Sequence, residues 1–167
     1  CIDDKAEVRD SASPELSSIR REVRIVHDRL MQKLQRLITD GSNTSWLQEP
    51  IITQRGGRYV IPIKADHKGR IPGLIHDQSA SGMTLFIEPL ATLELNNQWR
   101  ELQLAETREV LTCVRDEAGV SMSEGVLDRL VELTDYFHAG AAQPGRSVGL
   151  LRRVLAEQKG HERAVTE

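Results

Sequence analysis

The chain has 167 residues and a formal net charge of −3, with 22 Lys and Arg against 25 Asp and Glu. Aromatic residues make up 4% of the sequence, a composition that favours packed helices over a β-sandwich or barrel. The net negative charge argues against a polycation that coats nucleic acid, and no apolar run approaches the length of a membrane span.

The first residues of the chain and its two cysteines predict a reducing, cytoplasmic compartment. The sequence begins Cys1-Ile2-Asp3, without an initiator methionine or a charged and then apolar leader. We therefore expect an excised part of a cytoplasmic protein that has no secretory signal. Cys1 and Cys113 lack the spacing of metal ligands or of a redox pair, and two thiols in this length favour a reducing compartment.

A long amphipathic helix is expected from residue 14 to about residue 40. Ser13 can cap its first amides, and Pro14 suits the first helical position because it has no N–H to satisfy. Gly41 is expected to end the helix in a left-handed conformation. Apolar residues recur at steps of three and four and form one stripe: Leu16, Ile19, Val23, Val26, Leu30, Leu34 and Leu37.

After Pro50 the pattern changes to short strands separated by turns. The first two strands are joined at Arg55-Gly56-Gly57, and the last two at residues 79–82. Pro62 cannot donate a ladder hydrogen bond, so we expect its strand to lie at an edge of the sheet. The four expected strands are 51–53, 59–64, 73–78 and 83–88.

A second long helix is expected from Pro89 to about Ala118. A helix that is apolar on two sides packs against more than one neighbour, and we expect Trp99 to fill the core between helices. One apolar stripe contains Ala91, Leu95, Trp99, Leu102, Ala105 and Cys113. The opposite stripe contains Leu93, Leu104, Leu111 and Ala118.

Two shorter helices are expected after Gly119. Ser123 can cap the first of them, and its inner face is expected to carry Val126, Leu130, Leu133 and Phe137. The second helix is expected at 148–156, after a linker at 140–145 and before a frayed end at 160–167.

These elements predict an α+β fold that is mainly α-helical. Long antiparallel helices of similar length would carry a small antiparallel β-sheet that is inserted between them in the sequence. The expected parts are a first long helix with its lead-in at 1–50, the sheet at 51–88, the returning and packing helices at 89–138, and a linker with a C-terminal helix at 139–167.

Positive charge is concentrated in the predicted sheet. Residues 55–70 hold five cations against one anion, Asp66. Cations on a protruding sheet can neutralise phosphates without regard to base sequence, but they can also protect a sheet edge from pairing with another chain. The candidate nucleic-acid-binding residues are Arg55, Arg58, Lys64, Lys68 and Arg70.

Other polar residues of the predicted sheet lack a workable catalytic arrangement. His76 and Asp77 stand near Ser79 and Ser81, but neighbouring residues of a strand point to opposite faces and cannot orient one another as in a hydrolytic triad. The histidines and aspartates of this region also lack zinc-like spacing. We predict a polar strand end and a hairpin turn here, with no catalytic residue and no metal ligand.

Three motifs in the predicted sheet carry a family resemblance: 57–64 (GRYVIPIK), 76–82 (HDQSASG) and 84–89 (TLFIEP). They resemble the bacterial MutS-II family, a MutS paralogue associated with suppressing recombination. Similar stretches at 10–16 and 95–102 extend the resemblance, in order and spacing, from Ile2 to about Phe137. The resemblance implies that the sheet is a clamp that closes around DNA and that the long helices are its levers.

The same resemblance implies that the chemistry of the family lies elsewhere. The sequence contains no Gly-x-x-x-x-Gly-Lys-Ser/Thr motif, so we expect the ATPase domain and the nuclease-type module of the family to lie outside it. ATP and magnesium are expected for a longer parent protein, and no cofactor is expected for this part.

The expected function is therefore that of a non-catalytic DNA-binding lever and clamp from a MutS-like ATPase that works as a homodimer, without a membrane partner. Two alternatives stay open. Members of the family are also linked to stalled or collided ribosomes, so the clamp could contact ribosomal RNA instead of DNA. The chain could also be a structural oligomerisation module whose cations serve solubility.

Overall fold

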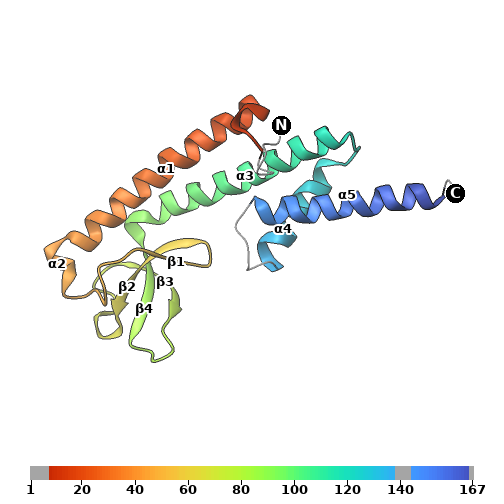
Figure 1. Cartoon of the computed structure of the whole chain (residues 1–167). Coiled ribbons are helices and arrows are strands. Elements are labelled where there is room, and N and C mark those ends of the chain that lie inside the picture. The colour runs from red at the N-terminus through yellow and green to blue at the C-terminus, as the bar shows by residue number, and fades with distance from the viewer. Residues whose placement is uncertain (1–7, 138–143, 166–167) are drawn as a thin grey trace. The chain divides into compact units, whose positions relative to one another are not determined.

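The computed structural model describes residues 8–137 and 144–165 (Figure 1). The helices are α1 (Pro14–Thr39), α2 (Gly41–Thr44), α3 (Leu93–Ala118), α4 (Glu124–Phe137) and α5 (Gly145–Val165). The strands are β1 (Thr53–Arg55), β2 (Arg58–Lys64), β3 (Gly73–Gln78) and β4 (Thr84–Pro89). The predicted α+β fold, mainly helical with an inserted antiparallel sheet, is confirmed.

The chain divides into two compact units. The sheet unit is Glu22–Glu101, and the helical unit combines Cys1–Arg21 with Leu102–Glu167. The four parts expected from the sequence follow changes of secondary structure, and this division stays a prediction. The helix expected at 148–156 is confirmed within α5, whereas the expected linker falls mostly on 140–143, outside the described residues.

The sheet is antiparallel throughout, with the strand order β1-β2-β4-β3. β2 lies opposite β4, with Ile61 facing Ile87 across the pair. Gly56 and Gly57 join β1 to β2 with φ angles of 55° and 75°, in the left-handed region that favours glycine and suits a two-residue hairpin turn. The expected turn is confirmed, although the first strand begins at Thr53 and not at residue 51.

Pro62 lies in a central strand, so the expected edge position of its strand is wrong. β1 pairs with β2 only as far as Val60, and beyond that point Leu47 bridges to Ile63. The amide of Gln48 donates to the carbonyl of Pro62 at 3.0 Å, which is also the side toward which an N–H of residue 62 would point. The missing donor therefore costs no hydrogen bond between β2 and β4.

The C-terminal end of α1 also differs from the expectation. α1 ends at Thr39, and Gly41 begins the short helix α2 instead of ending α1 in a left-handed conformation. The carboxylate of Asp40 accepts hydrogen bonds from the hydroxyl and the amide of Ser42, at 2.7 and 2.9 Å. These two hydrogen bonds lower the pKa of Asp40. A side-chain cap therefore sets this turn, and glycine does not.

In the helical unit, the first turns of α1 run antiparallel to α3. Ser13 caps α1 as expected, since its Oγ accepts the amide of Leu16 at 3.0 Å, and the same hydroxyl donates to Glu109 at 2.5 Å. Further along α1, Arg20 pairs with Glu106 at 2.8 Å. The later residue of α1, Arg20, thus pairs with the earlier residue of α3, Glu106, as in an antiparallel pair of helices.

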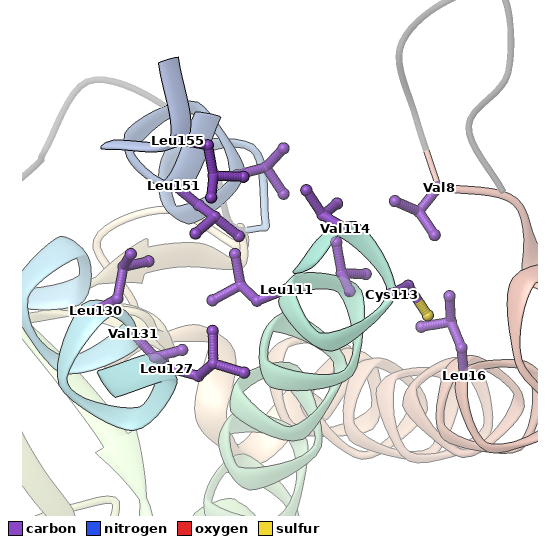
Figure 2. Packing of buried hydrophobic residues seen from close by; sticks show 12 residues of the cluster. Val8, Leu16, Leu111, Cys113, Val114, Leu127, Leu130, Val131, Leu151 and Leu155 are labelled. Carbon is purple, nitrogen blue, oxygen red and sulfur yellow. The ribbon is translucent and has the colours of Figure 1, made fainter. Parts of the chain in front are cut away.

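One apolar core holds the helical unit together (Figure 2). Leu111 of α3 points toward side chains of α4 and α5, whereas Cys113 lies beside Leu16 of α1. Leu111 and Cys113, one from each expected stripe of α3, therefore face different neighbours. The buried members of this core are Val8, Leu16, Val110, Leu111, Cys113, Val114, Leu127, Leu130, Val131, Val148, Leu151 and Leu155.

The buried face of α4 is rotated from the expected one. Val126 and Leu133 are 48% and 36% exposed, so their expected place on the inner face is wrong, while Leu130 is buried as expected. The side chain of Phe137 lies outside the described residues. The inner face follows the spacing i, i+3, i+4, i+7 and consists of Leu127, Leu130, Val131 and Thr134.

Leu127→Ala should lower the free energy of unfolding by about 3 kcal/mol, because it leaves a cavity in the core of the helical unit. Leu133→Ala is the same change on the same helix, and it should cost about 1 kcal/mol or less because that side chain is already partly in water. Urea unfolding followed by circular dichroism measures both variants. Equal losses would contradict the observed orientation of α4.

Candidate nucleic-acid interface

The five cations expected to bind nucleic acid fall into two groups within the sheet unit. Arg55, Arg58 and Lys64 lie on or beside strands and contact acceptors that belong to the fold itself. Lys68 and Arg70 lie in the segment that connects β2 to β3, and both are exposed. Neighbours in the sequence therefore differ in what they can offer to a partner.

Arg58 is held inside the sheet unit by a buried carboxylate. The side chain of Glu88 is 1% exposed, and its Oε1 lies 3.3 Å from Nη1 of Arg58. The same Nη1 donates to Oδ1 of Asn97 on α3 at 2.6 Å. The other oxygen of Glu88 is 2.6 Å from Nε2 of His76 on β3. Burying a carboxylate without partners costs folding free energy, so Arg58 is needed at this position to stabilise the fold.

The side chains of Arg55 and Lys64 already make contacts within the protein. Nε of Arg55 donates to Asp77 at 2.9 Å, and its guanidinium carbon lies 3.9 Å from the centre of the Phe86 ring. Nζ of Lys64 donates to the backbone carbonyl of Ser45 at 3.0 Å. Both side chains keep part of their surface in water, so they can shift toward an anion at the cost of these contacts.

Lys68 and Arg70 belong to a compact turn, residues 65–70, which we call the basic turn. The amide of Lys68 donates to the carbonyl of Ala65 at 3.1 Å, and the amide of Arg70 donates to that of His67 at 3.0 Å. Gly69 between them has a φ angle of 84°. Within the described part of the chain, neither cationic side chain has a hydrogen bond or an ion pair, so both remain open to a ligand.

Side chains of α1 and α3 fix the position of β2 through their contacts with Tyr59. Asn96 is fully buried, and its amide group bonds both backbone groups of Tyr59, at 3.0 and 3.1 Å. The hydroxyl of Tyr59 lies 2.9 Å from Nε2 of His27, and its ring centre lies 4.9 Å from that of Trp99. Trp99 is 6% exposed, so its expected burial is confirmed, and its ring packs beside both His27 of α1 and Tyr59 of β2.

The polar residues near the β3–β4 turn do not form a catalytic triad. His76 bonds Glu88 whereas Asp77 bonds Arg55, so the two neighbours serve different partners, although a register shift between Ile75 and Asp77 interrupts the expected alternation of this strand. Ser79 accepts the amide of Thr84 at 3.0 Å and thereby closes the hairpin. The importance of Glu88 and Asn96 was not evident in the sequence, because partners far apart in the chain leave no local pattern.

The described residues also bear on metal binding and on membrane insertion. No group of three or more His, Cys, Asp and Glu side chains in this part of the chain is arranged to hold a metal ion. In the same residues, no helix has the length and apolar character that would let it span a bilayer.

The fold and this surface define a class: an α+β segment in which a small antiparallel sheet, inserted in the sequence between two long helices, carries an exposed basic turn. No protein-family model matches the chain. It is 54% identical over 110 residues to the endonuclease MutS2 of Alkaliphilus oremlandii, and this match covers 66% of the chain and 14% of that protein.

Two further relatives match more of the chain. The endonuclease MutS2 of Thermomicrobium roseum is 45% identical over 141 residues, which are 84% of the chain and 17% of that protein. The endonuclease MutS2 of Lachnospira eligens is 42% identical over 160 residues, 93% of the chain and 20% of that protein. The resemblance to the MutS-II family is confirmed: the chain is a MutS2-like sequence that spans a fifth or less of these relatives' length.

Arg58→Met should lower the free energy of unfolding by about 3 kcal/mol, because it leaves the carboxylate of Glu88 buried with only His76 beside it. Adding Glu88→Gln to this variant should recover part of the loss, since it removes the buried charge. Arg70→Met is the matched control and should change stability by less than about 0.5 kcal/mol. Chemical denaturation measures all three, and an unaffected Arg58→Met variant would rule out a structural role for Arg58.

Proposed function

We propose that this chain is a DNA-gripping part of a longer MutS2-like protein and that the basic turn makes sequence-independent contacts with phosphates. The observation that carries this proposal is the exposure of Lys68 and Arg70 on an ordered turn, without an ion pair inside the described part of the chain. Long cationic side chains on a fixed backbone can reach phosphates along a duplex without reading its bases.

The other three cations of the original prediction take secondary roles in this proposal. Arg58 neutralises Glu88, and its contribution is to hold the sheet in shape. Arg55 and Lys64 can add contacts where DNA approaches closely enough to compete with Asp77 and the carbonyl of Ser45. The grip of one copy is therefore weak, and two phosphate contacts correspond to a salt slope of about −1.8.

A weak grip fits a dimer in which two copies hold the same duplex. Linking two weak sites raises the apparent affinity well beyond either alone. The sheet is joined to α3 both through the chain that follows β4 and through Asn96 and Asn97, which bond β2. A force on the sheet is thereby passed into that helix. In this proposal the chain itself performs no catalysis, and the ATP, magnesium and endonuclease chemistry belong to other parts of the longer protein.

Replacing Lys68 and Arg70 together with Gln should make the salt slope of duplex binding shallower by about 1.8, because two phosphate contacts are lost. The matched control is Arg129→Gln with Arg153→Gln, which removes the same charge from exposed positions on α4 and α5. Fluorescence anisotropy with labelled duplex DNA across a salt series measures the slopes. Circular dichroism checks that each variant is folded.

The same titration with branched DNA and with structured RNA separates the partners. Stronger binding to duplex or branched DNA supports the proposal, whereas stronger binding to RNA would favour contact with ribosomal RNA. If both double variants lose the same slope, the effect comes from net charge and the basic turn has no special role. If the folded chain binds no nucleic acid at low salt, the structural oligomerisation module becomes the better description.

A further inference from the structure

Met83 is the most exposed large apolar side chain among the described residues, at 69%, and Leu90 follows at 52%. Met83 lies between β3 and β4, directly before Thr84, the first residue of β4. Single exposed apolar residues are common on protein surfaces, so exposure by itself indicates no function. The surroundings of its backbone are what make this methionine unusual.

The backbone on both sides of Met83 is fixed by the hairpin. The amide of Ser79 donates to the carbonyl of Thr84 at 2.9 Å, and the amide of Gly82 donates to that of Ser79 at 2.8 Å. The side-chain amide of Gln78 adds a hydrogen bond to the carbonyl of Gly82 at 2.9 Å. An exposed apolar side chain is thus presented from a turn that is closed by several hydrogen bonds.

Two backbone hydrogen bonds connect Met83 to Lys68. The amide of Ala65 donates to the carbonyl of Met83 at 2.9 Å, and the amide of Lys68 donates to the carbonyl of Ala65 at 3.1 Å. The hairpin and the basic turn are therefore held together, and the exposed methionine and the exposed lysine start from neighbouring parts of the backbone. A duplex gripped by the basic turn would lie within reach of the thioether.

We propose that Met83 is an apolar wedge that enters the minor groove of duplex DNA and partly unstacks one base step while Lys68 and Arg70 hold nearby phosphates. This inference rests on the proposed function. Proteins that bind the minor groove insert apolar side chains, methionine among them, between base steps, and the bent duplex then gains further contact with the protein. A flexible thioether adapts to different steps, so the wedge requires no particular base sequence.

The test uses the whole chain and short duplexes that carry a single 2-aminopurine at varied positions, since the fluorescence of this base rises when it is unstacked. Saturating amounts of the unmodified chain should raise the fluorescence. Met83→Gln should abolish the rise and weaken binding about fivefold, with an unchanged salt slope because no phosphate contact is lost. Met83→Leu should keep both the rise and the affinity.

Leu90→Gln is the matched control, since it makes a comparable polar change at the next most exposed apolar residue of the sheet unit, and it should bind like the unmodified chain. Lys68→Gln with Arg70→Gln should remove most of the salt slope and the fluorescence rise with it, because the duplex is no longer held beside Met83. A Met83→Gln variant with unchanged fluorescence and affinity overturns the wedge and leaves the phosphate grip standing. A folded chain that binds no duplex at low salt overturns the grip, and the wedge with it.

Discussion

The carboxylate of Glu88 is the constraint on which the sheet unit depends. It lies on β4 with 1% of its side chain exposed, and removing a charge from water is favourable only with close and well-placed partners. Those partners come from two other strands, Arg58 from β2 and His76 from β3, and Arg58 is itself bonded to Asn97 on α3. One buried charge therefore fixes three strands and the start of a helix with respect to one another.

This arrangement determines which cations of residues 55–70 are available to a ligand. A count of residues 55–70 treats five cations as equal, but the fold uses Arg58 to neutralise Glu88 and draws Arg55 toward Asp77. Cations that satisfy internal acceptors stabilise the sheet and are not free to bind a ligand without a loss of stability. Lys68 lies outside these contacts, in the segment between β2 and β3, so the charge available for binding is smaller and more local than the sequence indicates.

Much of the fold follows from local rules that the sequence displays. The two glycines of the β1–β2 turn and the Ser13 cap were predictable because each acts on backbone within a few residues. Pro62 and the inner face of α4 were mispredicted because the outcome depends on which distant segment lies alongside, such as the backbone of Gln48 beside β2. The two partners of Glu88 were missed for the same reason, because residues 58 and 76 meet only once the sheet has formed.

A grip that ignores base sequence, as proposed for the sheet unit, sets its own physical requirements. The backbone that bears the proposed contact residues is held by hydrogen bonds, such as those that connect Met83 through Ala65 to Lys68. The side chains that would meet a ligand are long and unbranched. Fixed attachment limits the entropy lost on binding, and flexible ends accommodate whatever phosphate spacing or base step is present. Such contacts are individually weak, and in the proposed dimer a paired copy on the same duplex would repeat them without requiring a tighter site on either copy.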